Sequence, residues 1–192
     1  TSGATGKIRE AYDFDWVDDN ILVPVSDSLK PTTALTLQTW IKRTGTQVDW
    51  AKPIWMGQNA ATPYWPYGFQ TGGGADDNFS FCIASNTTQY SVSTGAVVAD
   101  NTRYKLEGVY NKSTLKVFLD NVEKGSANVT VNIGNYDATN WLWIWDRYAT
   151  WQSFNWIIDE TRILSTALSS DWRTTEYNNQ SDVSTFWTIS EV

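Results

Sequence analysis

The chain has 192 residues, with 21 carboxylates against 14 lysines and arginines, a formal net charge of −7 and no histidine. The excess of negative charge excludes a duplex nucleic-acid binder, which needs a basic surface to displace condensed counterions. The absence of histidine excludes Ser-His-Asp and Cys-His catalysis and histidine-ligated zinc, and the single cysteine, Cys82, excludes an intrachain disulfide.

Short segments of alternating apolar and polar residues run along most of the chain, separated by Gly, Asn, Asp and Pro. Many short strands at regular spacing are typical of a β-sandwich or barrel. A short helix or turn is expected within 165–178, with Ser169 and Ser170 as candidate caps. In chain order the predicted strands are 11–14, 21–25, 35–42, 53–56, 67–71, 78–84, 89–93, 104–111, 114–119, 122–126, 141–145 and 157–163.

The pattern contains no internal repeat, low-complexity block or linker. We therefore expect one domain over residues 1–192, with a core of about 8–164 and a C-terminal helix and tail over 165–192. Residues 1–6 look like the edge of a processed or trimmed fragment, and no strand is predicted there.

Four stretches of the chain stand out, AYDFDWVDDNILVP at 11–24, ALTLQTWIK at 34–42, EGVYNKSTLKVFLDN at 107–121 and FNWIIDETRI at 154–163. In this order they resemble the laminin-G-like (concanavalin A-like) jelly-roll family in the form common in bacterial surface and secreted proteins. The resemblance implies an all-β fold, an antiparallel β-sandwich jelly roll with two sheets of about six or seven strands. It does not define a function, because this fold is found in lectins, carbohydrate-binding modules, adhesion modules and enzymes.

Trp16, Trp145 and Trp156 stand where the family usually has glycine. Glycine suits a positive φ or a close backbone approach, whereas tryptophan is penalised at positive φ. Either large aromatics replaced glycine to build a binding surface, or the replacement reflects the UGA codon, which some bacterial codes read as glycine and others as tryptophan. Strained backbone at these positions would favour the second explanation, and relaxed backbone with stacked rings the first.

The chain lacks the residues that an enzyme of this fold would need. Glycoside hydrolases with this jelly roll resemble one another in a Glu-x-Asp-x-x-Glu strand, and retaining hydrolysis needs two carboxyl groups about 5–5.5 Å apart. No such triad occurs, and the adjacent Asp159 and Glu160 would point to opposite faces of a strand. Jelly-roll polysaccharide lyases usually need a tyrosine with a histidine or an Arg/Gln cluster, and this chain has no histidine. We therefore predict no catalytic residue.

Acidic side chains near the N-terminus and late in the chain suggest a calcium site. Calcium takes several oxygen ligands, often carboxylates mixed with backbone carbonyls. The resemblance implies one structural calcium ion, with Asp15, Asp18 and Asp159 as candidate ligands. The alternative is turn chemistry, in which Asp side chains accept hydrogen bonds from nearby backbone.

The twelve tryptophans, nine tyrosines and seven phenylalanines suggest a function in ligand contact. In residues 141–145 the period of two puts Trp141, Trp143 and Trp145 on one face and Leu142 and Ile144 on the other. If the two aliphatic residues enter the core, the three indoles form an outward ladder on which sugar rings could stack. The opposite orientation would force three tryptophans into the core, where they would be hard to pack.

A second aromatic segment contains Tyr64 and Trp65, which lie between Pro63 and Pro66, and Tyr67, which follows Pro66. Loops over a rigid sandwich commonly bind ligands, so these residues are candidate ligand contacts, with a lid over the core edge as the alternative. Among the other tryptophans, Trp40 is expected to be structural and to match a core position of the family. Trp172 and Trp187 are expected to anchor the C-terminal segment, and Cys82 to be a small buried hydrophobe.

These features favour a non-catalytic, lectin-like carbohydrate-binding module of a secreted or surface protein, extracellular or at the cell surface. Its expected partner is a polysaccharide or other glycan, with no nucleic acid, and with no membrane insertion because no apolar run is long enough to span a bilayer. The alternative is a structural or adhesion module of a surface layer or virion, whose aromatic face contacts a protein partner or a second copy. A glycan-active enzyme is the third hypothesis. The sequence does not define the glycan.

Overall fold

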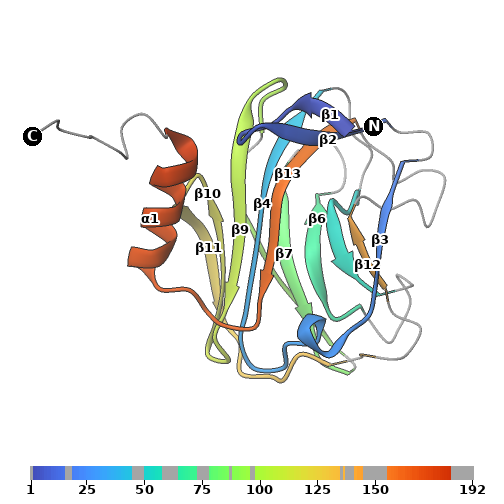
Figure 1. Ribbon diagram of the computed structural model, residues 1–192. Coiled ribbons are helices and arrows are strands. Elements are labelled where there is room, and N and C mark those ends of the chain that lie inside the picture. Colours follow the sequence, from blue (N-terminus) through green and yellow to red (C-terminus); the bar gives the residue numbers. More distant parts are fainter. Residues whose placement is uncertain are drawn as a thin grey trace, which may run out of the picture.

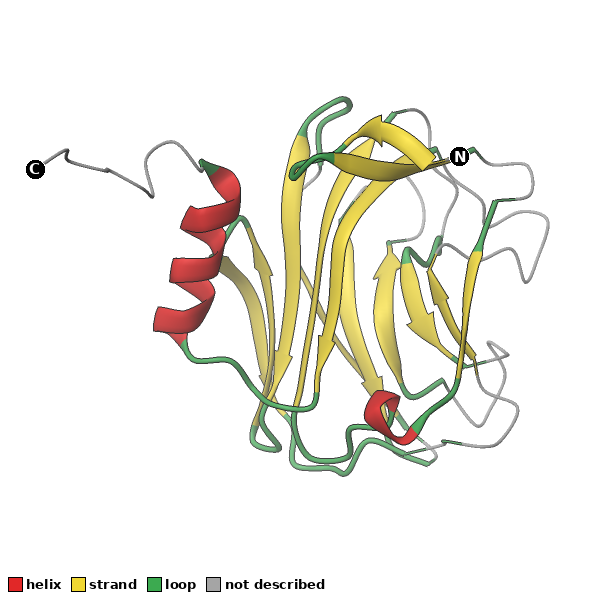
Figure 2. Ribbon diagram, in the orientation of Figure 1, coloured by secondary structure: helices red, strands yellow, loops and turns green. Residues whose placement is uncertain are grey.

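The computed structural model describes residues 2–15, 19–44, 50–57, 65–72, 78–86, 88–95, 98–134, 136, 141–144 and 155–182. Within these ranges the chain forms thirteen strands, one short 3-10 turn and one α-helix (Figures 1 and 2). The seven-stranded sheet has the order β1 (Ser2–Thr5), β2 (Glu10–Phe14), β13 (Trp156–Leu164), β4 (Leu35–Arg43), β9 (Arg103–Tyr110), β10 (Thr114–Leu119) and β11 (Val122–Asn128). The six-stranded sheet has the order β3 (Ile21–Pro24), β12 (Trp141–Ile144), β5 (Ile54–Met56), β6 (Tyr67–Thr71), β7 (Phe79–Ala84) and β8 (Gln89–Ser93). The turn η1 spans Asp27–Leu29 and the helix α1 spans Ser170–Ser181.

The two sheets pack face to face, and the predicted antiparallel all-β sandwich is confirmed. Alternate residues of each strand point into the space between the sheets, so that Leu35, Leu37 and Ile41 of β4 belong to one core with residues such as Phe69 and Phe81 of the opposite sheet. The predicted strands are all present, with bounds that differ by two residues at most where the chain is described. The expectation of a single domain over 1–192 stays a prediction.

Two elements depart from the sequence predictions. Strand β1 was not predicted, because Ser2–Thr5 contains only small residues without apolar alternation, and it forms by pairing with β2. Helix α1 has the predicted N-cap Ser169, whose hydroxyl accepts a hydrogen bond of 3.3 Å from the Trp172 backbone N–H, but it continues to Ser181, beyond the predicted limit of 178.

Trp156, at one of the three positions where glycine is usual, lies at the start of a regular strand. Its side chain is fully buried, and its ring meets Phe79 edge-on at 5.3 Å. Its φ is not among the positive values, which occur elsewhere in the described residues. The backbone at this position therefore imposes no need for glycine. Trp16 and Trp145 lie outside the described residues.

Helix α1 covers the outer face of the seven-stranded sheet (Figure 1). Trp40 of β4 is buried there and not between the sheets, because β4 sends its odd-numbered apolar residues into the core and its even-numbered residues to the outer face. The Trp40 ring stacks on Tyr177 at 5.9 Å, and its Nε1 donates a 2.8 Å hydrogen bond to Gln180. The ammonium of Lys7 lies 5.1 Å from the centre of the Trp40 ring.

The same face carries buried charges, which are paired across the sheet and the helix. Lys105 and Glu107 of β9 are each 3% exposed. Lys105 donates to Glu176 of α1 at 3.0 Å, and Glu107 accepts from Arg173 of α1 at 2.9 Å and from Gln38 of β4 at 2.5 Å. Buried charges are costly unless they are paired and hydrogen-bonded, so the sheet requires the helix side chains that reach it.

The first prediction concerns Gly108, which lies in β9 directly beneath Phe81 of the opposite sheet. A Cβ at this position would lie 2.3 Å from the Phe81 Cγ, far closer than two carbon atoms can approach without a shift. We expect Gly108→Ala to lower the free energy of unfolding by about 2 kcal/mol, measured by urea denaturation. In a Phe81→Ala background the same change should cost much less. Equal costs in the two backgrounds would contradict this packing.

The second prediction concerns acid sensitivity. Burial by itself raises the pKa of Glu176, but the hydrogen bond and charge of Lys105, with Gln38 and Arg162, outweigh it and hold the pKa below its ordinary value of 4.5. The pKa is thus lower in the folded state, so the contribution of Glu176 to stability is present above pH 4.5 and is lost as pH falls through the folded pKa. Glu176→Gln should lower the thermal midpoint at pH 7, and the difference from the wild type should shrink with acidification. A difference independent of pH would refute the assignment.

Candidate functional site

The strand β12 has one face toward the core and one toward the outside, as its sequence predicts. Leu142 is 3% exposed and belongs to the main core, and Ile144 packs against that core. Trp143 lies on the opposite, outer face of the six-stranded sheet, against a second cluster that contains Trp55. Trp141 is half-buried, and Trp145 lies outside the described residues.

Trp143 belongs to a row of residues that crosses the outer face of the six-stranded sheet, one from each strand. We call this the tryptophan row. Gly68 of β6 is the cross-strand neighbour of Trp55 in this row. A Cβ at position 68 would lie 2.8 Å from the Trp55 Cβ, so only glycine lets the Trp55 side chain lie beside β6. The strand registers give the order Leu22, Trp143, Trp55, Gly68, Cys82 and Ser91.

The centre of the row is a tightly packed cluster of aromatic rings. Trp55 is 1% exposed and meets Trp65 edge-on at 6.0 Å, and the Lys52 ammonium lies 5.0 Å from the Trp55 ring centre. The Nε1 atoms of Trp55 and Trp143 are buried and find no acceptor in the described part of the chain. Among the residues that the structure describes, the apolar surface near the row comes from partly exposed Trp141, Trp143 and Leu22, with polar residues farther along the face.

Two residues of the proline-flanked segment do not offer the surfaces predicted for them. Trp65 is 4% exposed and supports Trp55 from the side. Tyr67 is fully buried in the core, where its hydroxyl donates a 2.9 Å hydrogen bond to the Leu29 carbonyl and burial raises its pKa. A ligand cannot reach the Tyr67 ring in this arrangement, so both residues fit the alternative, packing at the core edge. Tyr64 lies outside the described residues.

Cys82 is fully buried within this cluster, as expected for a small hydrophobe. Desolvation raises its pKa to about 12, against the smaller lowering effects of the Gln89 hydrogen bond and the Lys52 charge. A thiol with such a pKa carries almost no thiolate at neutral pH and is chemically inert while the cluster is intact.

The acidic residues predicted to bind calcium are not gathered into one site within the described ranges. Asp159 accepts hydrogen bonds from three backbone amides, Lys7 at 2.6 Å, Ile8 at 3.2 Å and Glu160 at 2.8 Å. Only the bond from Glu160 is of the local turn type that the sequence left open. The bonds from Lys7 and Ile8, which are distant in sequence, close the turn between β1 and β2. Asp15 is exposed, and its backbone N–H donates to Asp19 at 3.0 Å.

Asp18 lies outside the described residues. In the part of the chain that is described, no group of three or more Asp, Glu, Cys or His side chains could hold a metal ion. The calcium site therefore stays a prediction.

Trp172 was expected to anchor the C-terminal segment, and this was wrong. Its side chain is 63% exposed, the most exposed of the large hydrophobic residues described. The contacts that hold α1 to the sheet come instead from residues on its sheet-facing side, such as Tyr177 and Gln180. The face of a helix on which a residue lies depends on where the helix begins and how it packs. The sequence alone therefore did not define whether Trp172 faces the sheet. Trp187 lies outside the described residues.

The family of the chain follows from its sequence. Residues 15–172 match the Laminin_G_3 model, described as the Concanavalin A-like lectin/glucanases superfamily, and the chain belongs to this family. The resemblance seen in the four sequence stretches is confirmed. No curated protein sequence matches the chain significantly. Within the described ranges, no helix combines the length and the hydropathy that a membrane crossing requires.

Several solved structures share the fold. The binding domain of Paraclostridial Mosquitocidal Protein 1 has a TM-score of 0.73 at 10% sequence identity, over 92% of this chain and 45% of that chain. Domain 4 of AbnA, a GH43 extracellular arabinanase from Geobacillus stearothermophilus, was solved in complex with arabinotriose. It has a TM-score of 0.68 at 19% sequence identity, over 93% of this chain and 80% of that chain. The binding domain of Botulinum Neurotoxin DC in complex with SialylT has a TM-score of 0.58 at 8% sequence identity, over 84% of this chain and 40% of that chain. The chain thus spans less than half the length of the first and third of these, and at such identities the likeness shows the fold alone.

The third prediction tests the packing of the tryptophan row through Cys82. Trp143→Ala removes a half-buried ring that packs against the cluster around Cys82. We expect a loss of about 2 kcal/mol in the free energy of unfolding and faster reaction of the thiol with an aromatic disulfide reagent under native conditions. Trp172→Ala is the matched control, because it removes an exposed tryptophan from α1, which packs on the seven-stranded sheet. It should change neither the free energy of unfolding nor the reaction rate of the thiol. An unchanged thiol rate in Trp143→Ala would contradict the arrangement.

Proposed function

We propose that this chain is a non-catalytic carbohydrate-binding module of a secreted or cell-surface protein, and that it holds a glycan on the outer face of the six-stranded sheet. The observation that carries the proposal is the placement of Trp143, whose partly exposed ring stands on that face over rings that are themselves fixed. A ring that is already immobile loses little conformational entropy when a sugar stacks on it.

The residues around Trp143 offer both further apolar contact and the hydrogen bonds that a sugar needs. Leu22, its cross-strand neighbour, is 42% exposed and extends the apolar surface. Farther along the same face, the strand alternation places Gln70 of β6, Ser80 of β7 and Ser91 of β8, whose amide and hydroxyl groups can hydrogen-bond sugar hydroxyls. An apolar platform beside a row of neutral polar groups suits a ligand with an apolar ring face and a polar rim.

The comparisons support the ligand class and the absence of catalysis. Domain 4 of AbnA was solved in complex with arabinotriose, and two of the similar structures are described as binding domains. In the described part of this chain, Glu107 of β9 lies under α1 and Glu176 of α1 faces the sheet. Both are paired with cations, which leaves them unsuited to acid–base chemistry on a bound glycan. One calcium ion near the loops that carry Asp15 and Asp18 is part of the proposal, with a structural role.

The fourth prediction is the direct test. Tryptophan fluorescence titrations against arabinan, xylan, galactan, β-glucan and chitin oligosaccharides, with calcium and then with EDTA, should give a saturable shift for at least one glycan. Trp143→Ala should weaken that binding about tenfold or more, and Trp143→Phe should retain part of it. Tyr12→Ala is the matched control, since Tyr12 is an exposed aromatic residue of the other sheet.

Unchanged affinity in Trp143→Ala would place the glycan elsewhere. If no glycan binds and Trp143→Ala instead abolishes self-association in sedimentation, the outer face is a protein interface and the module is structural. Loss of binding in EDTA, restored by added calcium, would support the calcium ion, whereas identical curves with and without EDTA would remove it from the proposal.

A further inference from the structure

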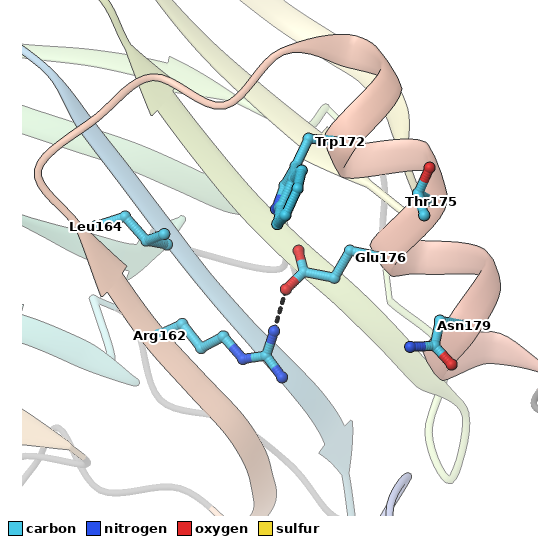
Figure 3. Close-up of a pocket in the computed structure, with 6 residues that line it drawn as sticks. All are labelled: Arg162, Leu164, Trp172, Thr175, Glu176 and Asn179. Carbon is cyan, nitrogen blue, oxygen red and sulfur yellow. Dashed lines mark hydrogen bonds and ion pairs between the residues drawn. The ribbon is translucent and has the colours of Figure 1, made fainter.

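A cleft lies between α1 and β13, on the side of the molecule opposite the tryptophan row. Its volume is about 380 Å³, which is within the roughly 300–1,000 Å³ of small-molecule sites. Figure 3 shows the Trp172 ring extending from the helix toward Leu164 and the Glu176 side chain reaching toward Arg162. The cleft is lined by Arg162, Leu164, Trp172, Thr175, Glu176 and Asn179.

The helix side of the cleft is a single stripe of residues. Trp172, Thr175, Glu176 and Asn179 are spaced three or four residues apart, so they lie on the same face of α1. The stripe begins with the aromatic ring, at a residue whose backbone N–H is held by the N-cap Ser169. The Trp172 ring is 63% exposed on a backbone that is locally fixed, which makes it a preformed platform.

The charged groups of the cleft balance one another. Arg162 donates to Glu176 of the helix and, at 2.8 Å, to Glu160 of its own strand. Beneath it, Glu176 also accepts hydrogen bonds from Lys105 at 3.0 Å and from Gln38 at 2.6 Å. In and beneath the cleft, three cations (Arg162, Lys105 and Arg173) meet three carboxylates (Glu160, Glu176 and Glu107). A phosphate or a carboxylate would have to displace an existing partner of Arg162, so the site favours an uncharged ligand.

We propose that this cleft binds an uncharged sugar residue of a glycan, as a second contact site separate from the tryptophan row. The sugar ring lies on the Trp172 indole, with Leu164 adding apolar contact at its edge. The Thr175 hydroxyl, the Asn179 amide and the remaining N–H groups of Arg162 exchange hydrogen bonds with sugar hydroxyls. The proposal rests on the proposed function for the class of ligand, but not for the place where it binds.

The composition of the cleft favours a sugar over a peptide. A peptide docked between a helix and a strand needs a continuous apolar groove for anchoring side chains. Here the only apolar side chains among the six lining residues are Trp172 and Leu164, and the other four are polar or charged. One exposed indole with hydrogen-bonding groups at two sides instead matches a small ring with a hydroxylated rim.

The experiment records the indole N–H signals of ¹⁵N-labelled protein during titration with neutral trisaccharides. The probes are arabinotriose, xylotriose, galactotriose, cellotriose, maltotriose and triacetylchitotriose, with trigalacturonic acid as the charged counterpart. The Trp172 signal is identified by its absence in Trp172→Phe. We expect it to shift saturably with at least one neutral trisaccharide and to shift less, or not at all, with the acidic one.

Trp172→Ala should weaken the binding measured at the cleft about tenfold, and Trp172→Phe should stay within about threefold of the wild type. Because the ring is exposed, both variants should keep the wild-type thermal midpoint, which verifies that they fold. In Trp143→Phe the shift of the Trp172 signal should persist with unchanged affinity.

The outcomes separate the two sites. A shift of the Trp172 signal without any shift of the Trp143 signal, which is identified by its absence in Trp143→Phe, supports the cleft and overturns the tryptophan row as a binding surface. Shifts confined to Trp143 overturn the cleft and leave the proposed function standing. Tighter binding of trigalacturonic acid than of every neutral probe overturns the inference of an uncharged ligand. No shift of the Trp172 signal with any probe overturns the proposal.

Discussion

The structure depends on the burial of both faces of its central strands. Strand β4 runs through the middle of the seven-stranded sheet with eight of its nine residues buried, although a sandwich core can cover only one face. The second face must therefore find a partner outside the core. Each sheet meets this requirement differently, and the two solutions determine what each side of the molecule can contact.

On the seven-stranded sheet the second face is polar and needs groups that match its charges. Lys105 and Glu107 would be uncompensated under an apolar cover, so the covering element has to bring Glu176 and Arg173 to the right places. This explains why α1 is a predominantly polar helix that nevertheless packs closely on a sheet. A helix held by specific pairs has a fixed rotation, and that rotation turns Trp172 away from the sheet centre toward the cleft.

On the six-stranded sheet the second face is aromatic, and the rings cover one another. Sequence alternation was sufficient to predict the strands and the outward position of Trp143, because a period of two is local information. The roles of Tyr67 and Asp159 could not be predicted, because they depend on Leu29 and on the amides of Lys7 and Ile8, which are distant in sequence. The expectation that Trp172 anchors the C-terminal segment was wrong for a related reason. Which side of a helix packs on a sheet depends on contacts with residues that are distant in sequence.

The two surfaces proposed to bind glycan lie on opposite outer sides of the sandwich, and this separation has a consequence for the binding strength that the proposals imply. Among the residues that the structure describes, Trp172 is the exposed large ring of one surface, and Trp143, beside half-buried Trp141, is that of the other. Under the two proposals each surface alone therefore offers few stacking contacts and a modest affinity. Two weak contacts on opposite sides cannot both bind one short oligosaccharide, but they can engage two chains, or two parts of one long chain that bends around the module. In a polysaccharide network, once one surface has bound a chain, other chain segments are held close to the second surface. The second contact therefore forms at a high effective concentration. A module built in this way would discriminate polysaccharide from its free fragments by avidity, without requiring a deep pocket for either.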